Sequence, residues 1–183
     1  MMNEELGIRN EVHLMKYVRA FALICCFVAV CAFCAAEAAL PNNSFAVLAN
    51  GISEQHNKTT EAIITRQLIA KGYKVVDPQK LESIKRDKIA RLALAGDVEA
   101  ILKLSSGHGA TMIVVQVEAG YPVLNEFQLY TGTSSLAVSV GAPNGSIIYA
   151  DTVMSKQVGY SPDEAAQKAV EAAAKKAVAN MTQ

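Results

Sequence analysis

The chain has 183 residues, of which 17 are basic and 17 acidic, so its formal net charge at neutral pH is zero. This length fits one domain of ordinary size, and the balanced charge argues against a nucleic acid or an anionic membrane as partner. All four cysteines lie in one apolar stretch near the N-terminus, so the rest of the chain has neither a disulfide framework nor a thiolate metal site.

The N-terminal segment has the three-part pattern of a secretory signal peptide. A short basic region precedes an apolar stretch at 21–33, and small residues follow it. We predict export with cleavage between Ala38 and Ala39. Residues 1–38 are then the signal peptide, and 39–183 form a single mature α/β domain in the periplasm or outside the cell.

Three alternatives stay open for this segment. Translation starts at Met15 if residues 1–14, which carry three acidic side chains, are an over-extended reading frame. The apolar stretch is a membrane anchor if it is not cut, although it is short for a bilayer span. Cys34 carries a lipid if the chain is a lipoprotein, although Cys31 and Phe33 occupy the places where lipoproteins have a leucine and a small residue.

The mature chain opens with strand and helix signals in turn. Residues 45–49 are apolar and predict a first strand. Residues with capping side chains around 57–60 predict the start of a helix that runs to about residue 71, where Gly72 is a normal stop. Residues 73–76 predict a second strand.

Two further helices and a central strand follow. Asp77 as N-cap and Pro78 at the first helical position predict one helix. Asp97 predicts the start of a shorter helix that ends at Gly107. The run at 107–117 is apolar on consecutive positions and rich in β-branched residues, which is typical of a strand covered on both faces.

The C-terminal part predicts a hairpin and a final helix. Residues 136–140 alternate between apolar and small polar side chains, the turn sequence at 143–145 follows, and 147–154 return antiparallel. We read 121–127 as a loop or an irregular strand extension. Ser161 and Glu164 form a capping-box pattern at the start of an alanine-rich helix.

The order of these elements is βαβα(α)βββα. Strands joined through helices should run parallel, by right-handed crossovers, and the last two strands should be antiparallel. We therefore predict an α/β (α+β) fold with a mixed five-stranded sheet and helices packed on it.

No set of side chains marks a catalytic, metal or cofactor site. His56 and His108 lie in different predicted loops without the spacing of metal ligands. The serine pairs at 105–106 and 134–135 lack the context of a nucleophile. We therefore predict a protein that is not an enzyme and that has no metal or cofactor.

One helix carries a band of basic residues that could bind a partner. The band consists of Lys85, Arg86, Lys88 and Arg91. The band is a candidate site for an acidic partner or polymer, although such bands more commonly form an ordinary solvated helix face.

Five segments together resemble a group of small envelope domains. They are the residues at 45–48, 72–77, 107–115, 144–148 and 161–166. In type and order they are similar to the TolB N-terminal domain, CsgG, LpoB and the middle domain of FlgT. The resemblance implies a non-enzymatic periplasmic module that binds another envelope protein in cell-envelope, flagellar or secretion assembly.

A second function and the partner class stay open beside this one. The alternative is a periplasmic module that binds a small ligand or a polymer through the basic helix face. We predict no nucleic-acid partner and no stable membrane span after signal removal, and we leave a homo-oligomer open.

Overall fold

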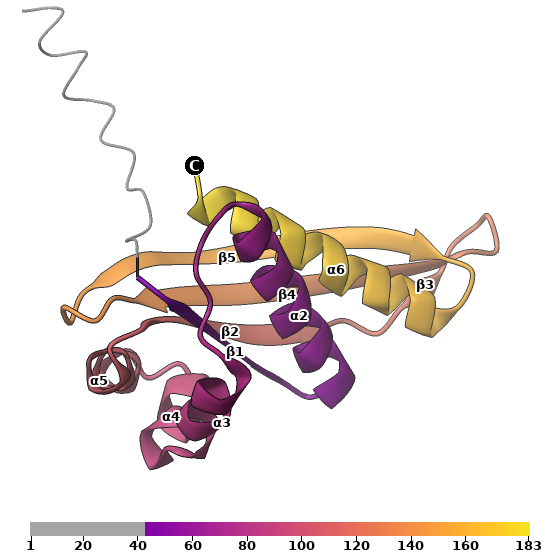
Figure 1. Ribbon diagram of the computed structural model, residues 1–183. Coiled ribbons are helices and arrows are strands. Elements are labelled where there is room, and N and C mark those ends of the chain that lie inside the picture. The colour runs from indigo at the N-terminus through magenta and orange to yellow at the C-terminus, as the bar shows by residue number, and fades with distance from the viewer. Residues whose placement is uncertain (1–42) are drawn as a thin grey trace, which may run out of the picture. The chain divides into compact units, whose positions relative to one another are not determined.

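The computed structural model describes residues 43–183, in which one mixed sheet lies between two groups of helices (Figure 1). Strand β2 pairs in parallel with β1 and antiparallel with β4, and β5 pairs with the other side of β4. The short β3 pairs with β4 next to β2. The strands are β1 (Phe45–Gly51), β2 (Thr111–Ala119), β3 (Val123–Leu124), β4 (Tyr130–Gly141) and β5 (Ile147–Gly159). The predicted fold class is confirmed.

Five described helices each begin after a side chain that caps the first free N–H groups. The helices are α2 (Glu54–Ala70), α3 (Pro78–Arg86), α4 (Lys88–Leu94), α5 (Val98–His108) and α6 (Pro162–Met181). The capping residues are Ser53, Asp77, Asp87, Asp97 and Ser161. None of these helices is both long enough and apolar enough to cross a membrane.

Strand β2 is covered on both faces, as its uninterrupted apolar run predicts. Ile113, Val115 and Val117 point toward α2 and α6, where they join one buried cluster. Met112 and Val114 point the other way and join a second cluster with residues of α3, α4 and α5. Successive side chains of a strand point to opposite faces of the sheet, and both faces are buried here, so each of these positions needs an apolar residue.

The predicted strand at 73–76 is wrong as a strand. Only Val75 bridges to Phe45, held by the bonds from the Phe45 N–H to the Lys74 carbonyl at 2.8 Å and from the Val76 N–H to the Phe45 carbonyl at 2.9 Å. The segment cannot extend further because the α3 cap and Pro78, which has no N–H, follow at once. The fifth strand is instead β3, within the stretch read as a loop or strand extension.

Three predicted boundaries also moved. Helix α2 begins earlier than expected because Ser53 caps it by accepting the His56 N–H. The single helix expected after Pro78 divides at Asp87, where the backbone is extended and the side chain caps α4 by accepting the Ile89 N–H. The central strand starts four residues later than predicted, because α5 continues to His108 and Gly109, with a left-handed φ of 58°, ends it.

Only one face of the β4–β5 hairpin is covered by a helix along most of its length. Helix α6 covers one face of both strands along its 20 residues. On the opposite face β4 carries small, partly exposed side chains such as Ser135, Ala137 and Ser139, and β5 carries the exposed Thr152, Met154 and Lys156. This face and the edge of β5 therefore stay open in the described part of the chain.

Candidate binding surface

The described residues, 43–183, hold no group of side chains arranged as a metal centre. No three His, Cys, Asp or Glu side chains of this range lie close enough to hold a metal ion. His108 Nε2 lies 3.3 Å from Asp87 Oδ2, and Asp87 also accepts the Ile89 N–H at 2.9 Å. The bond from Ile89, followed by that from His108, lowers the pKa of Asp87. This pair fastens the end of α5 to the start of α4, so His108 has a structural partner.

Tyr149, whose pKa is strongly raised, also makes a structural contact. The Tyr149 hydroxyl donates to Asp151 Oδ2 at 2.9 Å, and Asn180 Nδ2 donates to the same oxygen at 3.3 Å. Burial, and then the bond to Asp151, raises the pKa of Tyr149 to about 12. The phenol therefore stays protonated at neutral pH and ties β5 to the end of α6; it is not poised as a base.

The four predicted basic residues do not form one uniform band. Lys85 Nζ is 2.8 Å from Glu61 Oε2, and Glu61 Oε1 accepts the Ala49 N–H at 3.0 Å, so this lysine links α3 to α2 and β1. Arg86, Lys88 and Arg91 are exposed. The predicted partner-binding face therefore rests on these three, and its test should leave Lys85 in place, because reversing its charge would set two carboxylates side by side.

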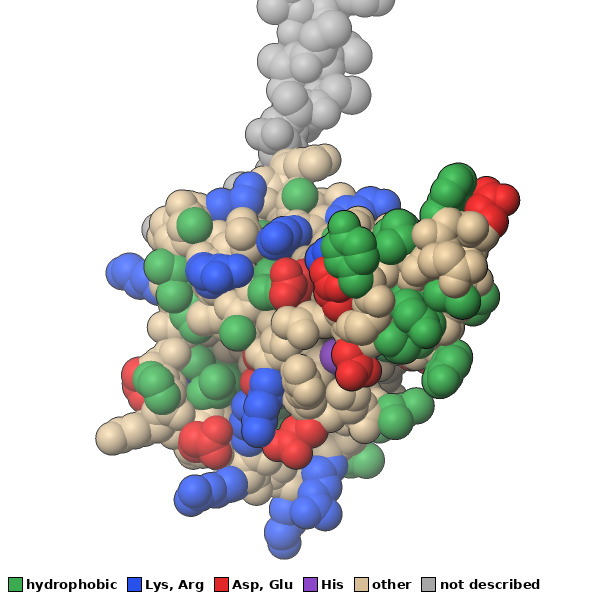
Figure 2. Space-filling model, turned by 90° about the vertical axis from the view of Figure 1, so that its right-hand side faces the viewer, with side chains coloured by type: hydrophobic (Ala, Val, Ile, Leu, Met, Phe, Trp, Pro, Cys, Tyr) green, Lys and Arg blue, Asp and Glu red, His purple; other side chains and the backbone are tan. Residues whose placement is uncertain are grey.

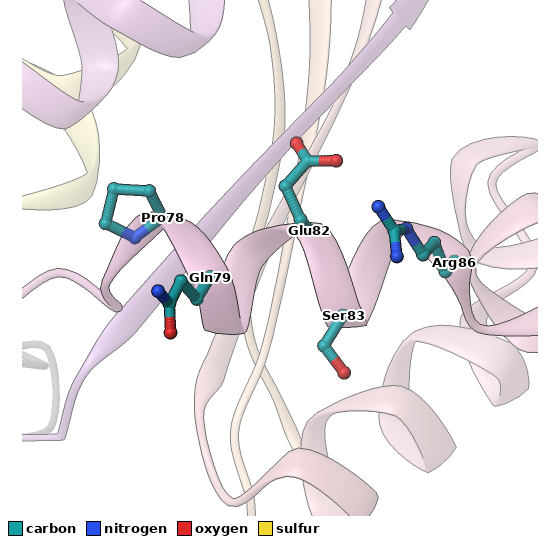
Figure 3. Close-up of a pocket in the computed structure, with 5 residues that line it drawn as sticks. All are labelled: Pro78, Gln79, Glu82, Ser83 and Arg86. Atoms are coloured by element: carbon teal, nitrogen blue, oxygen red, sulfur yellow. The ribbon is translucent and has the colours of Figure 1, made fainter.

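A hollow beside α3 offers little for a ligand. Its described lining consists of Pro78, Gln79, Glu82, Ser83 and Arg86. All five belong to one helix, and Figure 3 shows their side chains pointing in different directions along it. Ligand sites normally enclose their ligand with convergent polar groups, and these residues do not converge.

An exposed apolar surface lies at one end of the sheet, where β4 begins and β5 ends. Figure 2 shows apolar side chains gathered on one side of this end of the molecule. Tyr121, Phe127 and Tyr160 are 90%, 73% and 82% exposed. We call this surface the apolar end, and it comprises Tyr121, Val123, Leu124, Phe127, Val158 and Tyr160.

Hydrogen bonds hold the apolar end in shape. Asn125 Oδ1 accepts the N–H groups of Phe127 at 3.0 Å and Leu129 at 3.1 Å, and the Asn125 N–H donates to the Leu129 carbonyl at 2.8 Å. Val123 and Val158 both pair with Thr131 from opposite sides, so they lie in one cross-strand row on one face of the sheet. The loop that carries Phe127 is therefore fixed to the sheet by these bonds.

The sequence contained a signal for this surface that secondary-structure patterns do not use. Four large apolar side chains, at 121, 123, 124 and 127, follow or flank Gly120 and Pro122, which interrupt the pattern of a regular strand. Apolar residues in such a loop have no core to enter. They then remain exposed, and contiguous exposed apolar residues are uncommon on the surface of a monomeric domain.

The comparison with known families gives a clear result. A family model described as the TP0693-like lipoprotein, C-terminal domain, matches residues 50–182. The chain belongs to this family. No curated protein matches the chain. The description of the family names a lipoprotein and no catalytic activity, which fits an envelope-associated protein.

Two solved structures are similar to this TP0693-like domain at low identity. Lipoprotein GNA1162 from Neisseria meningitidis is 17% identical with a TM-score of 0.48, over 75% of this chain and 99% of that one. A PelC variant dodecamer from Paraburkholderia phytofirmans is 12% identical with a TM-score of 0.45, over 79% and 93%. These likenesses are too distant to assign a function.

The family match confirms the broader part of the resemblance stated from the sequence and leaves the finer part open. An envelope domain of lipoprotein type is supported. The relationship to TolB, CsgG, LpoB or FlgT is not confirmed, and neither is a role in flagellar assembly.

Proposed function

We propose that this TP0693-like domain is a non-enzymatic module of the cell envelope that binds another envelope protein through its apolar end. The observation that carries the proposal is the cluster of six exposed apolar residues, three of them aromatic, on one end of the sheet. Clusters of exposed apolar residues on soluble domains commonly mark interaction sites. Tyrosine and phenylalanine are enriched in protein interfaces.

The shape of the apolar end favours binding at low entropic cost. Phe127 stands on a loop whose backbone is fixed by Asn125, and Val123 and Val158 are held in a sheet row. A surface that is already ordered loses little conformational freedom when a partner docks. Glu126, exposed beside Phe127, adds a charge at the rim of the apolar area.

The placement of the apolar end suits a tethered protein. Phe45, at the start of β1, is in register with Thr111, and Met112 is in register with Gly141, at the far end of β4 from Tyr130. A strand of this length spans roughly 40 Å. The apolar end therefore lies at the opposite end of the sheet from Phe45, where the described strands begin.

Two mature forms of the chain are consistent with export. The signal-peptide pattern predicts a free domain that begins at Ala39, and the lipoprotein family favours a lipid on Cys34. We expect mass spectrometry of protein from envelope fractions to find the lipid on Cys34. A lipid-free chain that begins at Ala39 would make the domain a free periplasmic one, and a cytoplasmic chain that retains residues 1–38 would contradict export.

Capture of a partner from envelope extract tests the binding surface. We expect the triple variant Tyr121→Ser, Phe127→Ser and Tyr160→Ser to retain at least about tenfold less partner than the wild type, since buried aromatic residues contribute most of the energy in many interfaces. All three side chains are exposed, so circular dichroism should show an unchanged fold.

Two further variants serve as controls for this capture. The pair Ile69→Ser and Leu92→Ser removes apolar side chains that are 58% and 55% exposed on α2 and α4, and it should retain the partner. Charge reversal at Arg86, Lys88 and Arg91 tests the basic face. Loss of capture only in the charge-reversed chain would move the site to that face, and a tightly held small molecule without any protein would favour the ligand-binding function.

A further inference from the structure

We propose that the free edge of β5 pairs with the same edge of a second copy of this chain, antiparallel about a two-fold axis, so that two sheets join into one. This inference does not rest on the proposed function, because it uses the backbone edge of β5 centred on Val153; the edge and the apolar end share only Val158.

The hydrogen-bond pattern shows which backbone groups of β5 are free. The Gly120 N–H donates to the Thr133 carbonyl at 2.9 Å, so Thr133 directs its backbone groups toward β2. Backbone groups alternate along a strand, so Ser134 directs its own toward β5, where it pairs with Ser155. The even-numbered residues of β5 therefore point their N–H and C=O groups away from β4. They are Ala150, Thr152, Met154, Lys156 and Val158. The Thr152 N–H already donates to Asp151 Oδ1 at 2.8 Å and would exchange this bond for one to the second copy.

The two edges of the sheet differ in how they are protected. At the β1 edge, the segment around Val75 bonds to Phe45. Further along this edge, the Ala49 N–H donates to Glu61 Oε1 at 3.0 Å and the Gly51 carbonyl accepts from Asn57 Nδ2 at 3.2 Å. At the β5 edge, no described strand pairs with the outer side over 13 residues (Figure 1). Edge strands usually carry proline, several charges or an inward-pointing charge against pairing. Strand β5 has no proline, and Asp151 and Lys156 are its only charged residues.

Symmetric pairing suits the side chains of β5. Val153 is the middle residue of the strand, and a two-fold axis there sets Met154 opposite Thr152 of the second copy. The same axis sets Lys156 opposite Ala150 and Asp151 opposite Ser155 of the second copy, so no charge lies opposite a like charge. The chain has no net charge at neutral pH, so two copies do not repel each other as wholes.

Met154 indicates that this edge is an interface and not simply solvated. Its side chain is 67% exposed on the open face of the sheet, in the middle of the free edge. A single exposed methionine is unremarkable, but this one lies where the backbone donors and acceptors are also unpaired. Pairing with a second copy would satisfy those backbone groups and cover Met154 in the same step.

The test is the mass in solution of the full chain, purified in detergent and measured by light scattering over a range of concentrations. We expect the mass of two chains for the wild type. Met154→Lys places a charge at the centre of the edge and should give the mass of one chain, with the dimer dissociation constant raised at least tenfold. Leu92→Lys adds the same charge at an exposed position on α4 and should remain a dimer.

A wild type with the mass of one chain at every concentration, or of more than two chains, would overturn the proposal. So would a folded Met154→Lys chain that still forms dimers. If that variant does not fold, Thr152→Pro replaces it, because the Thr152 N–H faces away from β4 and donates only to Asp151 Oδ1 at 2.8 Å, so its loss breaks no bond between strands. We expect the triple variant at Tyr121, Phe127 and Tyr160 to remain a dimer. Dimer formation and partner capture can therefore fail independently of each other.

Discussion

Val114→Asp is expected to unfold the domain or to make it insoluble. Val114 is 2% exposed in the middle of β2, between Leu48 on β1 and Ser139 on β4, and its side chain points into the cluster under α3, α4 and α5. No cation of that buried cluster could pair with the new carboxylate. Burial of an unpaired charge commonly costs several kcal/mol, which is comparable to the roughly 5–15 kcal/mol of stability that a whole domain has.

Thermal unfolding of the purified variants measures this effect. For a domain of this size we expect a melting temperature lower by about 10 °C or more, or no cooperative transition. The matched control is Val123→Asp, since Val123 belongs to the same sheet but is 66% exposed on β3. It should melt within a few degrees of the wild type. Equal melting of Val114→Asp and wild type would mean that β2 is not covered on both faces.

The elements that the sequence predicted best are those in which one physical requirement acts alone. The apolar run of β2 needs cover on both faces, and nothing else in the chain competes with that reading. Ser161 caps α6 by accepting the Glu164 N–H at 3.2 Å, as the local pattern predicts. The Glu164 side chain, however, accepts the N–H of Tyr160 at 2.8 Å, one residue before the expected partner.

The elements that were mispredicted depend on contacts far apart in the sequence. The segment at 73–76 has the composition of a strand, but its length is limited by the cap of α3 that follows it. The pairing of Lys85 with Glu61 joins residues 24 positions apart, and no local pattern could show that this lysine was engaged. The apolar end left a local signal in its four large apolar residues at 121–127, but their association with the end of β5 could not be predicted, because only pairing through β4 brings the two segments together.

Gly132→Ala is expected to displace the start of α6 and to destabilise the domain. Gly132 on β4 and Gly159 on β5 form the floor on which the first turn of α6 lies, and a Cβ at Gly132 would overlap the Ala165 carbonyl group. A Cβ at Gly159 would come within 2.6 Å of the Ala165 nitrogen. These neighbours are helix backbone and cannot turn aside as a side chain would, so the helix itself must move.

The expected cost follows from two opposing effects. Overpacking of a close contact costs typically 1–3 kcal/mol. Replacing glycine by alanine stabilises by about 0.4–1 kcal/mol through the unfolded chain where the backbone suits alanine. The steric effect should be the larger one, since a Cβ at Gly132 would overlap the carbonyl oxygen and carbon of Ala165 and the nitrogen of Ala166. We expect denaturant unfolding to show a net loss of about 1–2 kcal/mol, with weaker partner capture because Tyr160 is bonded to the same turn through Glu164.

Gly107→Ala is the control that separates the two effects. Gly107 lies in α5, is exposed, and has nothing within 4 Å of the position that a Cβ would occupy. Only the gain from the unfolded chain and from helix propensity applies there, so this variant should be more stable than the wild type by about 0.4–1 kcal/mol. Stabilisation of both variants would show that α6 does not pack on Gly132 as closely as the structure has it. Destabilisation of Gly132→Ala alone would establish that Gly132 sets the position of α6, and with it the placement of Tyr160 in the apolar end.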